Sequence, residues 1–347
     1  MKPRATFICG GTLVPASRFR VHPVEAALRE QGWRTKLVHG YGSLDQKITH
    51  PLFRRAYRAM GRIQRAVRTG TMRIDGPVMV QRLAWPWYGA PEARLAERSD
   101  GLVFDFDDAV FLGESGRPSL GRRRALTRVF AASRHVVAGN SWLAAAIDAD
   151  VPVTVLPTCI DTSVYAPPEE RTCDAVPTIG WVGTGGNIPY LHQLVESVRK
   201  LRASGYKFKF HICSDVRPDR LLEELGATFT KWSAETELAF LQSLDVGLMP
   251  LEDNDWCRGK CSFKLIQYMA VGCPVVASDV GLNRDVVMDG QVGHLVRNSD
   301  WVSPLAYLLT EPDVRAEMGR AARHRAVAQF DSSVAVDAYR KILEGLQ

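Results

Sequence analysis

Short apolar runs rich in β-branched residues alternate along the chain with stretches whose apolar residues recur every three or four positions. We expect strands at 5–9, 34–39, 77–81, 102–106, 135–138 and 153–156, and again at 178–182, 208–213, 227–231, 245–249, 274–278 and 293–296. Helices are expected between them, for example at 23–31, 140–147, 190–203, 234–243 and 263–271. This alternation predicts an α/β protein with parallel sheets and crossover helices.

The strand pattern is interrupted once, at residues 157–177, a stretch with four prolines and weak periodicity. We interpret it as a linker between a first domain at 1–156 and a second at 178–330. A final helix at 331–347 lies past the last strand and can return to the first domain. Two doubly wound domains would each bind ligands outside the carboxyl ends of their strands.

Composition narrows the class of protein. A hydrophobic content of 46% with 24% charged residues excludes disordered and fibrous chains. No apolar run approaches the ~20 residues needed to cross a bilayer, and the opening MKPRATFICGG breaks at glycine, so we expect a cytoplasmic protein. The seven cysteines form no CxxC pair, which favours reduced thiols over disulfides or a zinc site.

The net charge of +6 is divided unevenly. Residues 1–156 hold 24 basic and 13 acidic side chains, a charge of +11, and the rest of the chain carries −5. The first half is therefore expected to face an anionic partner.

Part of that charge is concentrated at residues 51–73, a stretch with no acidic residue. Apolar residues there recur at helical spacing, namely Phe53, Tyr57, Met60, Ile63 and Val67. Between them lie Arg54, Arg55, Arg58, Arg62, Arg65, Arg68 and Arg73. Such a helix is typical of an anionic membrane surface, and a solvated helix packed on the first domain is the alternative.

The strongest chemical signal is the segment 259–278, in which a glycine-led loop opens a short helix that ends before a buried strand. A helix N-terminus presents unpaired N–H groups, so Lys260 and Lys264 beside it suit a diphosphate. Gln267 lies one turn farther on the same helical face. The alternative is a capped core helix with surface lysines.

This segment resembles the donor-binding signature of family-4 glycosyltransferases, in the branch with Gly-Lys, a later Lys and Glu-Tyr-Met-Ala. The chain departs from the signature at Gly259 and Gln267, where the family has glutamates. The resemblance implies the GT-B fold of two facing Rossmann-like domains. In the family the second glutamate holds the ribose hydroxyls, and Gln267 keeps hydrogen-bonding capacity without the charge.

The resemblance extends to the start of the second domain, where a strand runs into a glycine loop. It implies a binding site for a UDP- or GDP-linked sugar with no further cofactor. The residues implied are Gly183, Thr184, Gly185, Asn187, Lys260, Lys264, Leu265, Gln267, Gly281 and Asn283.

The first domain would then supply the acceptor side. Gly11 follows the first strand, and Ser17 to Val21 resembles a Ser-Arg-Tyr-Arg-Val run of the same branch. Arg18 and Arg20 suit a phosphate there, although surface arginines are the alternative.

The segment Asp105-Phe-Asp107-Asp108 ends a strand of the first domain and invites a manganese interpretation. We reject it, because the second domain already offers a diphosphate site, and we expect no metal. An unpaired carboxylate of Asp107 or Asp108 could instead orient or deprotonate an acceptor hydroxyl. Capping of the following helix is the competing interpretation.

Together these features predict a retaining, metal-independent hexosyltransferase that acts on a glycan or lipid-linked saccharide in polysaccharide or glycoconjugate synthesis. Lys260 and Lys264 would stabilise the leaving diphosphate, which can receive the acceptor proton. We expect a cytoplasmic protein, peripheral at the inner face of the membrane, with no nucleic-acid partner because the basic face lacks interleaved aromatics. A non-catalytic nucleotide-sugar-binding module and an epimerase are the alternatives.

Overall fold

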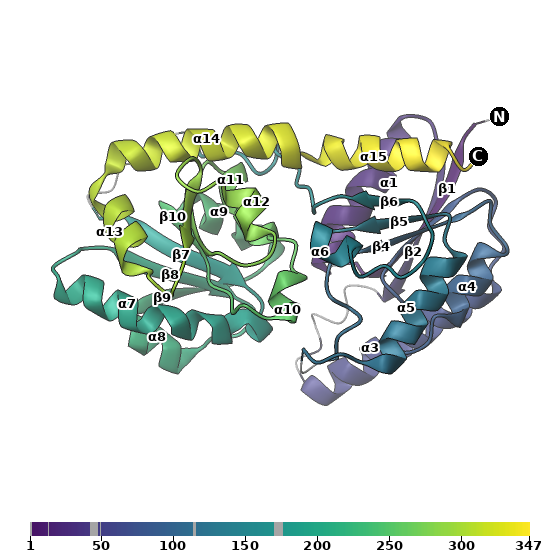
Figure 1. Ribbon diagram of the computed structural model, residues 1–347, viewed down its shortest axis with the longest axis horizontal. Coiled ribbons are helices and arrows are strands. Elements are labelled where there is room, and N and C mark those ends of the chain that lie inside the picture. The colour runs from purple at the N-terminus through teal and green to yellow at the C-terminus, as the bar shows by residue number, and fades with distance from the viewer. Residues whose placement is uncertain (1, 13, 42–47, 49, 114–115, 170–175) are drawn as a thin grey trace. The chain divides into compact units, whose positions relative to one another are not determined.

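The structure is a computed structural model that describes residues 2–12, 14–41, 48, 50–113, 116–169 and 176–347. It comprises two compact units (Figure 1). Unit 1 contains residues 1–159, 259–261 and 332–347, and unit 2 contains residues 160–258 and 262–331.

Unit 1 is built on a six-stranded parallel sheet in the order β2-β1-β3-β4-β5-β6. Its strands are β1 (Arg4–Gly11), β2 (Arg34–Tyr41), β3 (Val78–Gln81), β4 (Leu102–Phe106), β5 (His135–Ala138) and β6 (Val153–Val155). Its helical segments are η1 (Ser17–Val21), α1 (His22–Glu30), α3 (Pro51–Thr71), α4 (Ala90–Ala96), α5 (Leu120–Ala132), α6 (Ser141–Ala144) and α15 (Ser332–Glu344).

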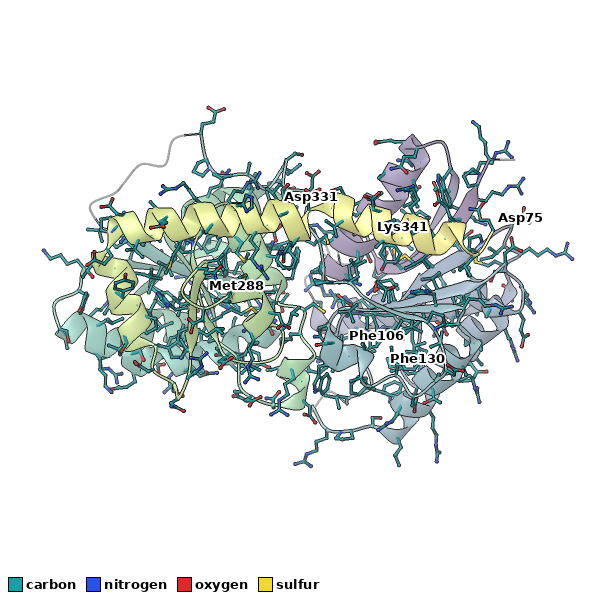
Figure 2. All side chains as sticks on the ribbon, turned by 45° about the horizontal axis from the view of Figure 1, so that its top comes forward. Asp75, Phe106, Phe130, Met288, Asp331 and Lys341 are labelled. Atoms are coloured by element: carbon teal, nitrogen blue, oxygen red, sulfur yellow. The ribbon has the colours of Figure 1, made fainter. Side chains whose placement is uncertain are left out.

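The core of unit 1 joins both ends of the chain. Val24 and Leu28 of α1 pack with Phe7 of β1, and Tyr339 and Leu343 of α15 belong to the same buried cluster. Figure 1 shows α15 alongside α1. The final helix therefore completes the first domain, as the sequence suggested. Elsewhere in unit 1, the rings of Phe106 in β4 and Phe130 in α5 lie 5.5 Å apart between centroids (Figure 2).

Unit 2 has a second six-stranded parallel sheet, in the order β12-β11-β10-β7-β8-β9. Its strands are β7 (Thr178–Gly183), β8 (Lys209–Ser214), β9 (Ala227–Lys231), β10 (Val246–Met249), β11 (Val275–Ser278) and β12 (Gly293–Val296). Its helical segments are η2 (Gly185–Leu191), α7 (His192–Ala203), α8 (Asp219–Leu225), α9 (Ala234–Gln242), α10 (Asp255–Arg258), α11 (Phe263–Ala270), α12 (Asn283–Val287), α13 (Val302–Thr310) and α14 (Pro312–Phe330).

Each sheet has a position at which its strand order reverses. In unit 1 the reversal lies between β1 and β3, and in unit 2 between β7 and β10. Loops that follow these strands are where doubly wound sheets bind ligands. The predicted fold of two doubly wound α/β domains is confirmed.

The segment expected to be a linker is partly fixed to unit 2. Ile160 donates a backbone hydrogen bond to Phe330, and the hydroxyl of Tyr165 donates to Glu237 Oε2 at 2.6 Å. Residues 170–175 lie outside the described residues.

Two expectations from composition can be compared with the described residues. No helix among them is both long enough and apolar enough to span a membrane. Their six cysteines are buried free thiols, and Cys173 lies outside the described residues.

Candidate functional site

One candidate site lies in unit 2, where the end of β7 meets the start of α11. The ammonium of Lys264 lies 5.6 Å from the centroid of the Trp181 ring. A Cβ atom added at Gly183 would lie 2.8 Å from Lys264 Cε and 2.4 Å from the Trp181 ring. Only glycine therefore lets the lysine chain lie against the end of this strand.

The start of α11 is held by a buried polar network. Ser262 has a left-handed backbone with φ of 50°, and its hydroxyl donates to Asn283 Oδ1 at 2.7 Å. The Asn283 amide donates in turn to the carbonyl of Ser278 at 3.0 Å. Asn283 was expected to contact the donor, but the structure places its fully buried side chain as an anchor between α11 and β11.

Gly281, also expected on the donor side, lies close to the chain before α11. Its φ is +54°, and an added Cβ would lie 2.9 Å from the backbone of Arg258. Both the left-handed conformation and the close approach require glycine here.

Gln267 is the buried polar residue of α11, with 4% of its surface exposed. Among the described residues, its side-chain nitrogen Nε2 has no hydrogen-bond partner. A buried amide donor without an acceptor is costly, so this atom is available to a ligand oxygen. Leu265, another predicted donor residue, is buried in the core.

The segment after β7, which includes the start of η2, holds the remaining predicted donor residues. The Asn187 amide donates to Thr184 Oγ1 at 3.0 Å. The backbone N–H of Gly185 donates to Asp215 Oδ1 at 2.7 Å. Because this N–H already has an acceptor in the protein, a diphosphate at this site would depend mainly on cationic side chains.

A separate candidate site lies in unit 1, at the end of β4. Arg20 Nε donates to both carboxylate oxygens of Asp105, at 2.9 and 2.8 Å. The Tyr339 hydroxyl of α15 donates to the same carboxylate at 2.7 Å. Arg20 was expected on the acceptor surface, but the structure places it in the interior with 2% of its side chain exposed.

Asp107 and Asp108 follow β4, and both are paired with Arg82. Arg82 Nε donates to Asp107 Oδ1 at 2.7 Å, and its NH2 group donates to Asp108 Oδ2 at 2.5 Å. Gln81 adds a hydrogen bond to Asp107 at 3.0 Å. The expectation of an unpaired carboxylate is therefore wrong.

Arg82 is the residue that the sequence analysis missed. It follows β3, whose Gln81 is in register with Asp105 of β4, and its backbone φ is 55°. A non-glycine residue in the left-handed region is uncommon and typical of functional sites. The sequence contained a signal for this pairing. Arg82 directly follows one expected strand, and Asp107 and Asp108 directly follow the next.

The electrostatics of the two carboxyls differ. Burial favours the neutral form of Asp107, but Arg82 and Arg20 outweigh it and hold the pKa below its ordinary value. Burial raises the pKa of Asp108, with Asp107 adding to the effect and Arg82 and Lys260 opposing it. Asp107 is thus the carboxyl that stays ionised.

Lys260 belongs to unit 1 and Lys264 to unit 2. The Lys260 carbonyl accepts a hydrogen bond from the Asn140 amide at 3.1 Å, and the next residue, Cys261, donates its thiol to the Asp107 carbonyl at 3.0 Å. The half-buried Lys260 therefore lies beside Asp107 and Asp108.

The remaining predicted acceptor residues follow β1. Gly11 is the last residue of β1, and Arg18 lies in the π-helical turn η1, with its guanidinium 4.8 Å from the centroid of the Phe19 ring. π-Helical turns occur frequently at functional sites. The two residues therefore lie at the strand end where this sheet reverses order.

Helix α3 turns its apolar stripe outward. Gly61, Arg65 and Thr69 form its buried side. Exposed on the opposite side are Leu52, Phe53, Met60, Ile63 and Val67, each more than half accessible. The expectation that Arg65 belongs to the exposed arginine face is wrong, because its guanidinium donates to the carbonyls of Gln81 and Arg82.

A groove of about 620 Å³ lies between α3 and the end of β2. Its apolar lining comes from Tyr57, Met60, Ile63 and Val67, and its polar lining from His39, Gln64 and Arg68. The groove can hold an amphiphilic molecule.

Comparison with known families finds a similarity within the second half of the chain. Residues 176–311 match the family model described as glycosyl transferases group 1. The matched residues, which are fewer than half of the chain, are similar to this family and include Gly183, Lys264 and Gln267.

Relatives match this chain over limited segments. One segment of 82 residues is 40% identical to the phosphatidyl-myo-inositol mannosyltransferase of Mycobacterium leprae (strain TN), and covers 23% of this chain and 22% of that protein. Matches to the curated relatives cover between 16% and 43% of their lengths.

Solved structures match nearly the whole chain. Sucrose-phosphate synthase from Thermosynechococcus elongatus is 14% identical, with a TM-score of 0.72 and 99% of each chain covered. HepE from Anabaena, in complex with UDP and glucose, is 13% identical with a TM-score of 0.69, and 99% of this chain and 100% of HepE are covered. These likenesses show that the chain has the GT-B fold of two Rossmann-like domains.

Proposed function

We propose that this protein is a glycosyltransferase that moves a hexose from a nucleotide sugar to a hydroxyl acceptor. The observation that carries the proposal is the position of Lys264 in the segment that is similar to group 1 glycosyl transferases. It lies at the start of α11 and at the end of β7, where the strand order of the sheet reverses. A cation and a helix N-terminus at such a point suit a diphosphate.

The donor is a UDP- or GDP-linked sugar. Gln267 supports this assignment, because its buried Nε2 needs an acceptor that a ribose hydroxyl would supply. HepE, which shares the fold, was solved with UDP and glucose. Among the remaining predicted contacts, Thr184 and Asn187 lie in the segment after β7, and Gly281 lies in the turn after β11. Leu265 and Asn283 are buried and would support the site from the core.

The reaction proceeds with retention of configuration and without a metal. Lys264, and Lys260 with it, stabilise the charge that develops on the leaving diphosphate, which accepts the proton of the acceptor hydroxyl. The carboxylates of Asp105 and Asp107 already accept hydrogen bonds from Arg20 and Arg82, which supports lysines over a metal as phosphate ligands. The ionised Asp107 orients the acceptor hydroxyl.

The acceptor is a glycan or lipid-linked saccharide used in cell-surface polysaccharide or glycoconjugate synthesis. Gly11 and Arg18 offer a site at the end of β1, and the groove beside α3 offers an apolar wall for a lipid. The mycobacterial relative is named for transfer to phosphatidyl-myo-inositol, which supports a lipid acceptor. The outward apolar stripe of α3 supports docking at the inner, anionic face of the membrane.

Incubation of the protein with labelled UDP- and GDP-sugars and with lipid-linked saccharide acceptors tests this function. We expect label to move to the acceptor with release of the nucleoside diphosphate. Binding without turnover would favour the non-catalytic module. That alternative is specific to this chain because Gln267 stands where the family has a glutamate. Conversion of the donor to an epimer without an acceptor would favour an epimerase.

A further inference from the structure

Three metal-ligating side chains converge in unit 1 beside the groove of α3, and the proposed transfer reaction assigns no chemical step to them. They are Cys9 near the end of β1, His22 at the first position of α1 and His39 near the end of β2. One ligand atom from each residue lies within 4.8 Å of the other two. The sequence analysis expected no metal and did not single out these three residues, which lie far apart along the chain.

The fold brings the three side chains together through backbone features. Cys9 and His39 are direct partners in the parallel register of β1 and β2. His22 comes from the helix that packs on the same strand, and Pro23 follows it in the first turn of α1. The cluster therefore rests on regular elements, which hold ligands more accurately than loops do.

The imidazoles already point at each other. Their Nε2 atoms lie 2.9 Å apart, and their ring planes cross at 79°. Two nitrogens bound to one tetrahedral Zn²⁺ at ~2.0 Å lie about 3.3 Å apart, so a separation larger by a few tenths of an ångström admits the ion. The Sγ of the fully buried Cys9 supplies a third ligand from the core side.

We propose that Cys9, His22 and His39 form a binding site for a transition-metal ion of the zinc type. A thiolate with two imidazoles is a donor set that Zn²⁺ prefers, and water can take the fourth position. On binding, the Cys9 thiol releases its proton to solvent, and both imidazoles carry their remaining proton on Nδ1. The ion would tie β1, α1 and β2 together.

The charges around the site are mixed. Arg18 lies near His22 and Arg65 near Cys9, and both disfavour a cation. The carboxylate of Glu25 lies near both histidines and favours a cation there. The thiolate formed on binding adds the negative charge that offsets the arginines.

Cobalt titration of the chelator-treated, full-length protein tests the site, because Co²⁺ reports its ligands by absorption. We expect one equivalent to bind with a thiolate-to-cobalt charge-transfer band and tetrahedral visible bands, and Zn²⁺ to displace it. Cys9→Ser and His39→Asn should lose these bands. Cys159→Ser, in the same buried core, and His135→Asn, on β5, are the matched controls and should keep them.

If the two site variants fail to fold by circular dichroism, X-ray absorption of the zinc-loaded wild type replaces them. We expect one sulfur and two imidazole nitrogens around the zinc. Binding below one equivalent, a shell without sulfur, or control variants that lose the bands would overturn the proposal. None of these measurements depends on sugar transfer.

Discussion

At the residue scale, Lys264 is the side chain to which the proposed function assigns the donor diphosphate. Its ammonium lies over the Trp181 ring, and Gly183 leaves space for its aliphatic chain. Lys264→Ala removes a charge-assisted contact worth about 1.5–3 kcal/mol, so turnover at subsaturating donor should fall at least about tenfold. Lys200→Ala, an exposed lysine of α7, is the control, and equal kinetics for both variants would contradict the assignment.

The effect of Gln267 on donor binding can be measured separately from its effect on the stability of the fold. Its Nε2 is buried without a partner among the described residues, so Gln267→Met removes an unsatisfied donor at similar volume. We expect the free energy of unfolding, measured in urea, to stay the same or rise. The KM for the donor should increase about fivefold or more, since a hydrogen bond worth ~1 kcal/mol is lost. A drop in stability with an unchanged KM would show that Gln267 is structural.

At the scale of single elements, α3 is the helix that we propose to dock on a membrane. Its exposed face presents Phe53, Met60 and Ile63 next to Arg55 and Arg62. Near an anionic surface each arginine contributes ~1 kcal/mol, so binding should be reversible and weaken with salt.

Sedimentation with liposomes that contain anionic lipid measures this binding. Replacing the exposed Arg55, Arg62 and Arg68 with glutamine should move the protein to the supernatant. Arg65 is left intact because it holds α3 to the end of β3. Exposed Arg123→Gln and Arg199→Gln in other helices are the control. Wild-type protein that stays in the supernatant at low salt would argue against membrane docking.

The elements show what could be predicted from sequence and what could not. Strand positions depend on local apolar runs, and all twelve expected strands are present. The amphipathic character of α3 was also readable, but the side on which it packs was not. That side is set by Arg65, which donates to the carbonyls of Gln81, the last residue of β3, and of Arg82, which follows β3. Side-chain pairs between distant segments, such as Arg82 with Asp107 and Arg20 with Asp105, are likewise nonlocal.

At the scale of the whole molecule, half-buried histidines in both units predict how stability varies with pH. Burial lowers the pKa of His135 on β5 and of His211 on β8, and each ring nitrogen lies within 2.9 Å of a threonine hydroxyl. The unfolded chain takes up these protons near pH 6.5, whereas the folded protein takes them up only at a lower pH. The contribution of the two histidines to the free energy of unfolding is therefore fully present above pH 6.5 and is lost as the pH falls below it.

Thermal unfolding between pH 7.5 and 5.5 checks this prediction. The wild-type Tm should fall as the pH is lowered. The double variant His135→Asn and His211→Asn should show a smaller fall, whereas His324→Asn, an exposed residue of α14, should behave like the wild type. An identical pH dependence for the double variant would contradict the assignment.

The measurement that tests the central claim most directly is a crystal structure of the protein soaked with a UDP-sugar and, separately, with a GDP-sugar. The account predicts a diphosphate within hydrogen-bonding distance of Lys264 Nζ at the start of α11, with a ribose hydroxyl accepting from Gln267 Nε2. A nucleotide bound elsewhere, or a diphosphate held through a metal ion on Asp105 and Asp107, would contradict it.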